Sequence, residues 1–199
     1  MKKRISVVDD DPAVIDSIRL LLQSQGFETD CHADATSLLA SQTATDCILS
    51  DVRMPGMNGV DLMRELQTRK DARPIILLTG HGDIEMAVNA IKGGAFDFIE
   101  KPFDPSRLIA AIGNAINKAV ENKVIQEETA LWKERYDSLT DRQRETMALL
   151  VQGFANKEIA TRLGISPRTV EIHRTWVMDK MAARTLAELV RMGISLDVV

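Results

Sequence analysis

Short apolar segments alternate with longer amphipathic segments along the first 118 residues. Each short segment is bounded by turn residues, which is typical of a buried strand. Between them, apolar residues recur every three or four positions, as on one face of a helix. Strands are predicted near Ile5–Val8, Glu28–His32, Cys47–Ser50, Ile75–Leu78 and Asp97–Glu100, and helices after Asp11-Pro12 and near Ala35–Ser41, Gly59–Arg69 and Ile84–Lys92. This alternation predicts an α/β domain with a (βα)5 doubly wound parallel sheet of flavodoxin-like order.

A further helix is predicted to begin at Asp104-Pro105 and to continue past the end of this domain. Its apolar stripe reaches Ala119, and neither proline nor glycine interrupts the chain from Asn114 to Asp137. The segment then becomes charged and loses most of its apolar residues. We therefore predict a domain over residues 1–120 and a helical linker over 121–137. A frayed helix end followed by a loose tether is the alternative.

The last part of the chain, residues 138–199, has a purely helical pattern. Thr140 and Gln143 have capping-box spacing, as do Thr185 and Glu188. Gly164 suits a tight turn, and the following Ser166-Pro167 suits a helix start. The sequence predicts an all-α domain of four helices. The inward stripe of its third helix is Val170, His173, Val177 and Met181, and Trp132 and Trp176 are interpreted as packing residues.

Charge and composition exclude few classes of protein. The hydrophobic content of 45 % fits a chain that forms a core, and no targeting or membrane segment is visible. Cys31 and Cys47 lack metal-ligand spacing and are interpreted as reduced residues of a cytoplasmic protein. The net charge is −4 over residues 1–118, −2 over 119–137 and +2 over 138–199, so only the last part has a charge that favours nucleic acid.

Charged and hydroxyl side chains follow the predicted strands at one edge of the sheet. Asp9 and Asp10 end the first strand, Asp51 the third, Thr79 the fourth and Lys101 the fifth. Because the carboxyl ends of parallel strands share an edge, these groups are expected to converge there. Clustered carboxylates repel one another, and hard oxygen ligands suit Mg²⁺. Taken singly, each residue has a simpler explanation as a helix cap, a turn or a strand end; the ordered set favours a binding site.

The segments "VVDDDP", "LSDVRMPGMNG", "LLTGHGD" and "DFIEKPF" resemble the receiver domain of two-component response regulators. This resemblance implies that Asp51 is the phosphoacceptor and Thr79 the switch hydroxyl. It also implies that Lys101, before a cis Pro102, pairs with the phosphate. Asp10, Asp51 and the backbone carbonyl of Arg53 would bind Mg²⁺ directly, and Asp9 would help through a water. Many receivers carry a switch tyrosine where this chain has Phe98, which leaves the remodelled face less certain.

The chemistry of these side chains agrees with the implied roles. Phosphoryl transfer depends mostly on positioning and on neutralising negative charge, which a fixed carboxylate, Mg²⁺ and a lysine can provide. An ionised Asp51 is already a nucleophile, so it needs no general base.

Residues 138–199 resemble the LuxR-type helix-turn-helix domain through "NKEIA", "LGIS" and "TVEIH". The order of receiver, linker and this domain resembles the FixJ/NarL class, and within it most closely FixJ. A recognition helix needs a short turn before it and a polar outward face. Without the resemblance, a protein-binding helical bundle would remain a serious alternative, because +2 is a weak electrostatic signal for DNA. The residues expected to contact DNA are Lys157, Arg168, Thr169, Glu171, Ile172, Arg174 and Thr175.

The sequence therefore predicts a cytoplasmic transcription regulator, not an enzyme, with no membrane partner. Its expected partners are a sensor histidine kinase, promoter DNA, a second copy after phosphorylation and RNA polymerase. The dimer surface is expected around Asp83–Phe103, by resemblance. One rival is an aspartyl-phosphate hydrolase, but the position two residues after Asp51, where such enzymes commonly have an acid, is Arg53. The other rival is a regulator that senses a small molecule.

Overall fold

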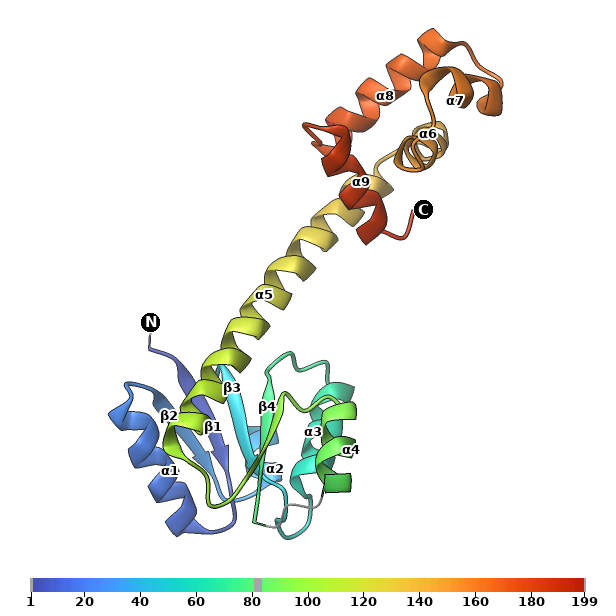
Figure 1. Cartoon of the computed structure of the whole chain (residues 1–199). Helices are drawn as coiled ribbons and strands as arrows, with labels where there is room; N and C mark the ends of the chain where they lie inside the picture. The colour runs from blue at the N-terminus through green and yellow to red at the C-terminus, as the bar shows by residue number, and fades with distance from the viewer. Residues whose placement is uncertain (1, 81–83, 199) are drawn as a thin grey trace. The chain divides into compact units, whose positions relative to one another are not determined.

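The computed structural model describes residues 2–80 and 84–198, with the side chains of residues 84–86 left out. The chain forms two compact units, Met1–Glu121 and Asn122–Val199. Figure 1 shows a sheet with surrounding helices in the first unit and helices alone in the second.

The first unit contains the predicted parallel sheet. Its order is β2-β1-β3-β4-β5, which is the flavodoxin-like order, and every neighbouring pair of strands is parallel. The fold class is thus confirmed. Three strands are one residue longer than the sequence pattern suggested, so that Asp51 and Thr79 lie inside their strands as the last residues. The strands are β1 (Arg4–Val8), β2 (Glu28–His32), β3 (Cys47–Asp51), β4 (Ile75–Thr79) and β5 (Asp97–Glu100).

Helices cover both faces of this sheet because successive strand residues point to opposite sides. Cys47 and Leu49 join one core cluster with Leu22 of α1 (Pro12–Ser24), whereas Ile48 joins the opposite cluster with Leu62. The first cluster also contains Leu108 and Ile112 of α5 (Pro105–Asp137), and the second is covered by the other three helices of this unit (Figure 1). These are α2 (Ala35–Ala40), α3 (Gly59–Thr68) and α4 (Ile84–Lys92).

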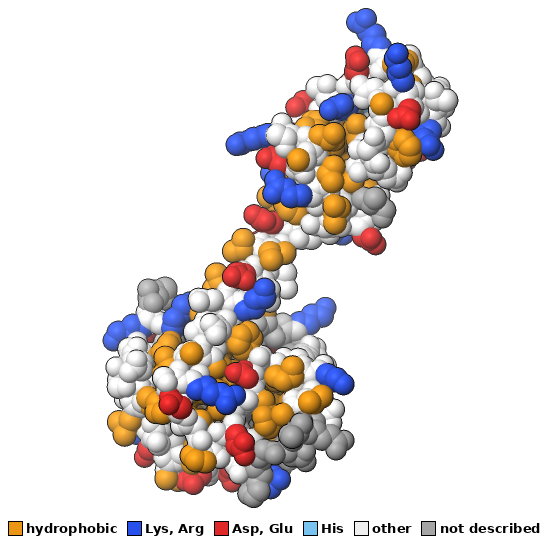
Figure 2. All heavy atoms as spheres, in the orientation of Figure 1, with side chains coloured by type: hydrophobic (Ala, Val, Ile, Leu, Met, Phe, Trp, Pro, Cys, Tyr) orange, Lys and Arg blue, Asp and Glu red, His pale blue; other side chains and the backbone are white. Residues whose placement is uncertain are grey.

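Helix α5 (Pro105–Asp137) runs without a break through 33 residues, so the segment 121–137 is helical. Its buried residues end at Ile116. Farther along, Val120, Val124, Ile125 and Leu131 are each about half exposed. Hydrophobic side chains are accordingly visible at the surface along the middle of α5 in Figure 2.

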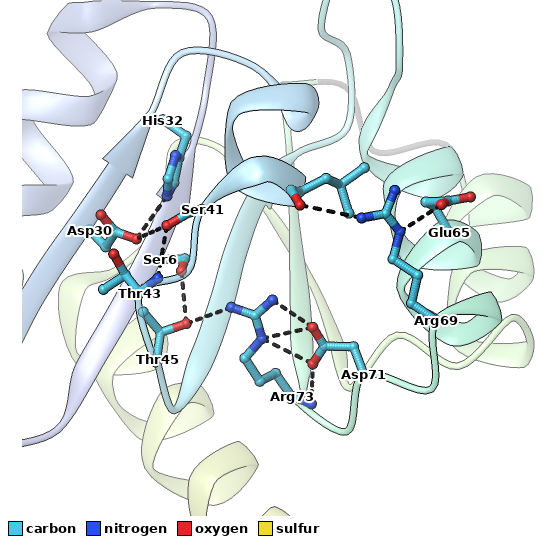
Figure 3. Close-up of polar contacts among 11 residues, drawn as sticks. Ser6, Asp30, His32, Ser41, Thr43, Thr45, Glu65, Arg69, Asp71 and Arg73 are labelled. Atoms are coloured by element: carbon cyan, nitrogen blue, oxygen red, sulfur yellow. Dashed lines mark hydrogen bonds and ion pairs between the residues drawn. The ribbon is translucent and has the colours of Figure 1, made fainter.

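A polar network lies near the amino ends of the strands in the first unit (Figure 3). The guanidinium of Arg73 donates to both carboxylate oxygens of Asp71 and to the Thr45 hydroxyl, 2.9 Å away. Thr45 shares a second hydrogen bond of 2.9 Å with Ser6, whose side chain is fully buried in the sheet. The pKa of Asp71 is affected first by burial, which would raise it, but hydrogen bonds and charge from Arg73 outweigh burial and lower it.

Besides the last part of α5, the second unit contains α6 (Asp141–Val151), α7 (Asn156–Leu163), α8 (Pro167–Met181) and α9 (Leu186–Ser195), which confirms the predicted four-helix fold. The Thr140–Gln143 capping box is present, and Ser166 caps α8 with Pro167 at its first position. Gly164 has the left-handed conformation predicted for the turn, with φ of 65°. This geometry joins α7 to α8 as a helix-turn-helix requires.

Two predictions about the second unit are wrong. The Thr185 side chain caps α9 as expected, but the Glu188 carboxylate accepts from the backbone N–H of Arg184 rather than that of Thr185, so the box is only half formed. Trp132 packs against the helical core, whereas Trp176 is 49 % exposed and is not a packing residue. The Trp176 ring lies on the flank of α8, outside the stripe that faces the core.

Cys31 and Cys47 form no disulfide, and burial raises the pKa of the Cys47 thiol to about 12. Within residues 2–80 and 84–198, none of the helices has the length and apolar character needed to cross a bilayer.

Candidate functional site

Three of the predicted side chains meet at the carboxyl edge of the sheet. The Lys101 ammonium, just after β5, donates to Asp9 Oδ2 at 2.7 Å and to Asp51 Oδ1 at 2.6 Å. Asp9 is 3 % exposed and Asp51 is 8 % exposed. The convergence arises because the parallel strands β1, β3 and β5 end at the same edge.

Backbone N–H groups fix the second oxygen of each buried carboxylate. Asp51 Oδ2 accepts from the N–H of Arg53 at 2.6 Å, and Asp9 Oδ1 accepts from the N–H of Asp11 at 3.0 Å. Both carboxylates are therefore held on one side by the chain that follows their own strand and on the other by Lys101. Such fixed geometry favours chemistry that depends on positioning.

The two carboxylates determine the charge state of Lys101. Burial by itself would lower the pKa of its ammonium, but hydrogen bonds and negative charge from Asp51 and Asp9 outweigh burial and raise the pKa above its usual value. Lys101 consequently stays charged at neutral pH and supplies a fixed positive charge beside Asp51.

Gly59 positions the loop after Asp51, a role that the sequence pattern did not predict. Its N–H donates to the Val52 carbonyl at 3.0 Å, and a Cβ at this position would overlap the Asp51 backbone carbonyl oxygen. Asn58 caps α3 by accepting from the N–H of Asp61. The "MNG" turn thus packs the start of α3 directly against Asp51. The Asn-Gly turn signal was visible in the sequence, but the close backbone approach was not.

The remaining receiver residues border this cluster. Thr79 is buried as the last residue of β4, and its carbonyl accepts from the Lys101 N–H at 2.6 Å. The Lys101-Pro102 peptide is cis, as the resemblance implied. Phe98 is half-buried and packs with the cluster on the α3 side of the sheet. Asp10 and Arg53 are exposed. His81, Gly82 and Asp83 of the "LLTGHGD" motif lie outside the described residues.

The donor set at this edge suits a hard cation. Two buried carboxylates, the adjacent Asp10 and the Arg53 carbonyl are all oxygen donors, and Mg²⁺ needs only one or two carboxylates because it keeps several waters. Among the residues that the structure describes, no three acidic, histidine or cysteine side chains are already grouped as metal ligands. Lys101 lies between Asp9 and Asp51 instead, which leaves Asp10 as the more accessible carboxylate.

Helix α8 presents a second candidate site in the second unit. Val170, Val177 and Met181 are buried as predicted, while His173 is only partly buried. On the opposite face, an open depression of about 460 Å³ is lined by four residues that were predicted to contact DNA: Arg168, Glu171, Ile172 and Thr175.

The other predicted DNA contacts surround this depression less closely. Lys157 is exposed at the start of α7, and the Arg174 guanidinium donates to Asn156 Oδ1 at 3.5 Å. The Thr169 hydroxyl is hydrogen-bonded to Ser166 at the cap of α8. Figure 2 shows Lys and Arg side chains projecting from the second unit among scattered acidic ones, which agrees with its weak net charge.

Comparison with known families matches both units. Residues 5–113 match the response regulator receiver domain, and residues 137–193 match the bacterial regulatory proteins of the luxR family. The chain belongs to the two-component response regulators. FixJ of Azorhizobium caulinodans, a transcriptional regulatory protein, is 44 % identical over 96 % of this chain and 91 % of its own.

Other response regulators show similar relationships. The response regulator TmoT of Ectopseudomonas mendocina is 41 % identical over 94 % of this chain and 86 % of its own. The solved full-length FixJ of B. japonicum covers 100 % of this chain and 99 % of its own, with 41 % identity and a TM-score of 0.62. The structure of the response regulator StyR covers 96 % and 98 %, with 37 % identity and a TM-score of 0.76.

These relationships establish the general function. The chain is a phosphorylation-activated, DNA-binding transcription regulator of the FixJ type, whose partners include a sensor kinase and DNA. Its relatives are transcriptional regulators, so the hydrolase rival is set aside. Receiver domains as a family use Mg²⁺ for phosphorylation, which agrees with the oxygen donors at the carboxyl edge.

Proposed function

We propose that Asp51 accepts the phosphoryl group from a histidine kinase. The observation that carries the proposal is the convergence of Asp51, Asp9 and Lys101 at one strand edge, with Asp51 fixed by the Arg53 N–H. A carboxylate oxygen of Asp51 forms the new P–O bond, and the phosphorus–nitrogen bond to the kinase imidazole breaks. Lys101 neutralises charge on the transferring group. After transfer, the Thr79 hydroxyl donates a hydrogen bond to a phosphoryl oxygen.

Mg²⁺, held by Asp10, Asp51 and the Arg53 carbonyl with Asp9 nearby, would supply further neutralisation of the phosphoryl oxygens. After transfer, Thr79 and Phe98 carry the change toward the surface that includes β5. Pro102 keeps the Lys101 loop beside the site. Switching of this kind requires an element with two arrangements that the phosphoryl group favours unequally.

Labelling by a small acyl phosphate tests the acceptor. Incubation with acetyl phosphate and Mg²⁺ should add one phosphoryl group to the parent protein and none to Asp51→Asn, as measured by intact mass. Asp71→Asn, which alters a carboxylate at the opposite edge of the sheet, is the matched control and should be labelled like the parent. Full labelling of Asp51→Asn would assign the phosphoryl group to another residue.

We further propose that phosphorylation promotes dimerisation through the surface around Asp83–Phe103, in which Asp83 lies outside the described residues. Val88 and Ile91 of α4 support this proposal, because they expose 44 % and 46 % of their surface. Sedimentation should show a dimer for the phosphorylated parent and a monomer for Asp51→Asn. A monomeric phosphorylated protein would contradict the proposal.

The proposed modules are the receiver over residues 1–120, the helical linker over 121–137 and the DNA-binding domain over 138–199. A dimer would place two recognition helices on a two-fold related promoter site in the cytoplasm, where RNA polymerase is also available as a partner. Glu171, Ile172 and Thr175 are proposed to read bases, whereas Lys157, Arg168 and Arg174 bind phosphates, and Thr169 is proposed as a further DNA contact at the cap of α8.

Base preference and salt dependence distinguish these two groups. Glu171→Ala should relax the preference at one position of each half-site selected from a random pool. Lys157→Ala should weaken all duplexes alike and lower the slope of log affinity against log salt by about one unit. The opposite pattern would reverse the assignments.

A further inference from the structure

The feature that the fold leaves unexplained is the exposed indole of Trp176. The ring exposes 49 % of its surface, although tryptophan is usually well buried. It lies four residues after Ile172, which is itself 44 % exposed, so the two side chains are neighbours on the surface of α8. The helical core uses Trp132 but not Trp176.

The position of Trp176 around the helix relates it to the outward face. At about 100° per residue, the mean direction of Val170, Val177 and Met181 defines the core side of α8. Trp176 then lies about 60° from the opposite, outward direction, whereas Glu171 lies about 80° from it on the other flank. Trp176 is therefore at least as well placed as Glu171 to contact whatever covers this face.

The position of Trp176 along and around α8 indicates which part of a duplex it would meet. A rise of 1.5 Å per residue places it about 12 Å beyond Arg168, toward the carboxyl end of the helix. The amino-terminal part of a recognition helix contacts base edges in a major groove about 12 Å wide. Thr175, one residue earlier, is proposed to read bases, but Trp176 is turned about 100° from it around the helix, so on the flank we expect it to meet the groove wall, which is made of sugars and phosphates.

The chemistry and orientation of the ring fit that wall. An indole has one N–H donor and no acceptor, and a phosphodiester offers only acceptors. The ring is held by an edge-to-face contact with His173, with centroids 5.5 Å apart and planes at 75°. This contact orients the indole before binding and reduces the entropy lost when a partner covers it.

We propose that Trp176 is a positioning residue for DNA, whose N–H donates to a backbone phosphate while its ring packs on the adjoining sugar. The proposal rests on the assignment of the outward face of α8 to the major groove. The contact fixes the depth and rotation of α8 in the groove. It does not discriminate between sequences, since phosphate contacts carry no sequence information. It extends the surface of Arg168, Glu171, Ile172 and Thr175 by an uncharged contact.

The affinity, base preference and salt slope of Trp176 variants distinguish this role from others. The probe is a duplex recovered from a random-sequence pool with the phosphorylated parent protein. Trp176→Ala should bind this duplex about tenfold more weakly, with the same base preference and the same salt slope as the parent. Trp176→Phe should lie between the two, because it keeps a ring but loses the donor. Ile194→Ala, which removes another exposed apolar side chain of the same unit, should bind like the parent.

Fluorescence reports the contact directly, because Trp132 and Trp176 are the two tryptophans of the chain. In a Trp132→Phe protein, the duplex should change the emission of Trp176 and at least halve its quenching by acrylamide. Unchanged quenching under conditions where anisotropy shows binding would overturn the proposal. So would parent-like affinity of Trp176→Ala, including the case in which that variant loses only transcription activation, which would assign the ring to a protein partner.

Failure of the proposed groove-facing role of α8 would give different results from failure of the Trp176 proposal. If the parent recovered no preferred duplex, or if Glu171→Ala left base preference unchanged, the proposed groove-facing role of α8 would fail. A change of base preference in Trp176→Ala alone would overturn only the backbone role of Trp176.

Discussion

The two edges of the parallel sheet both carry buried or partly buried charge, but they balance it differently. At the amino edge, Arg73 forms an ion pair with Asp71 and donates a hydrogen bond to the Thr45 hydroxyl (Figure 3). One positive charge is thus balanced by one negative charge. At the carboxyl edge, Lys101 is shared by Asp9 and Asp51, and Asp10 follows directly in the chain. The Arg73–Asp71 pair is neutral, whereas the cluster at the carboxyl edge carries excess negative charge.

This difference separates groups that stabilise the fold from groups that are available for chemistry. A matched, hydrogen-bonded pair contributes to stability and offers little to a ligand. Excess carboxylates destabilise the folded state by mutual repulsion, but they attract a cation and can then accept a phosphoryl group. We therefore expect substitutions at the two edges to have opposite effects on stability.

Breaking the amino edge should have the largest effect. Arg73→Ala leaves Asp71 partly buried without its cation and removes a partner of Thr45, so the free energy of unfolding should fall by about 3 kcal/mol. Urea unfolding followed by far-ultraviolet circular dichroism measures this loss.

Arg69→Ala is the matched control, because Arg69 also contacts a carboxylate, Glu65, but its side chain is 50 % exposed (Figure 3). Its loss should cost less than about 1 kcal/mol. Equal losses for the two variants would mean that burial does not distinguish the pairs.

The Asp71 carboxylate should also make stability dependent on pH. Because the folded state lowers the pKa of Asp71 from its usual 3.8, its contribution is present above that value and is lost as pH falls through the lower, folded-state pKa. Asp71→Asn should therefore cost about 1.5 kcal/mol at neutral pH and progressively less below pH 3.8. A difference between variant and parent that stays constant down to the acid limit would contradict the charged role.

The carboxyl edge should respond in the other direction, although weakly. Asp10→Asn removes an exposed negative charge beside Asp9 and should stabilise the protein by about 0.5 kcal/mol in the absence of divalent cations. Thermal unfolding with a chelator present measures the gain. A clear loss of stability would show that Asp10 is held by compensating contacts and that the edge has no excess charge.

The sequence predicted the carboxyl edge better than the amino edge for a physical reason. Asp9, Asp51, Thr79 and Lys101 each end or follow a parallel strand, so the fold class alone brings them together. Thr45 and Arg73 lie in loops 28 residues apart, and no periodic pattern predicts their hydrogen bond. The amino-edge network therefore became visible only in the folded chain.

The wrong predictions about the second unit have a similar origin. The spacing of Thr185 and Glu188 predicted a capping box, but the backbone before the cap turns the Arg184 N–H toward Glu188 instead. Trp176 was interpreted as a packing residue, yet its side chain is 49 % exposed on the flank of α8. Side-chain type predicts burial less reliably on a helix flank than along a continuous core stripe.

Binding of Mg²⁺ tests the contrast between the edges most directly. The measurement is the free energy of unfolding of the parent, Asp10→Asn and Asp71→Asn as Mg²⁺ is raised at constant ionic strength. The parent and Asp71→Asn should both gain about 0.4 kcal/mol when Mg²⁺ equals its dissociation constant, and more with the logarithm of concentration. Asp10→Asn should gain much less over the same range. Equal gains in all three proteins, or a gain lost only in Asp71→Asn, would contradict the assignment of the excess charge to the carboxyl edge.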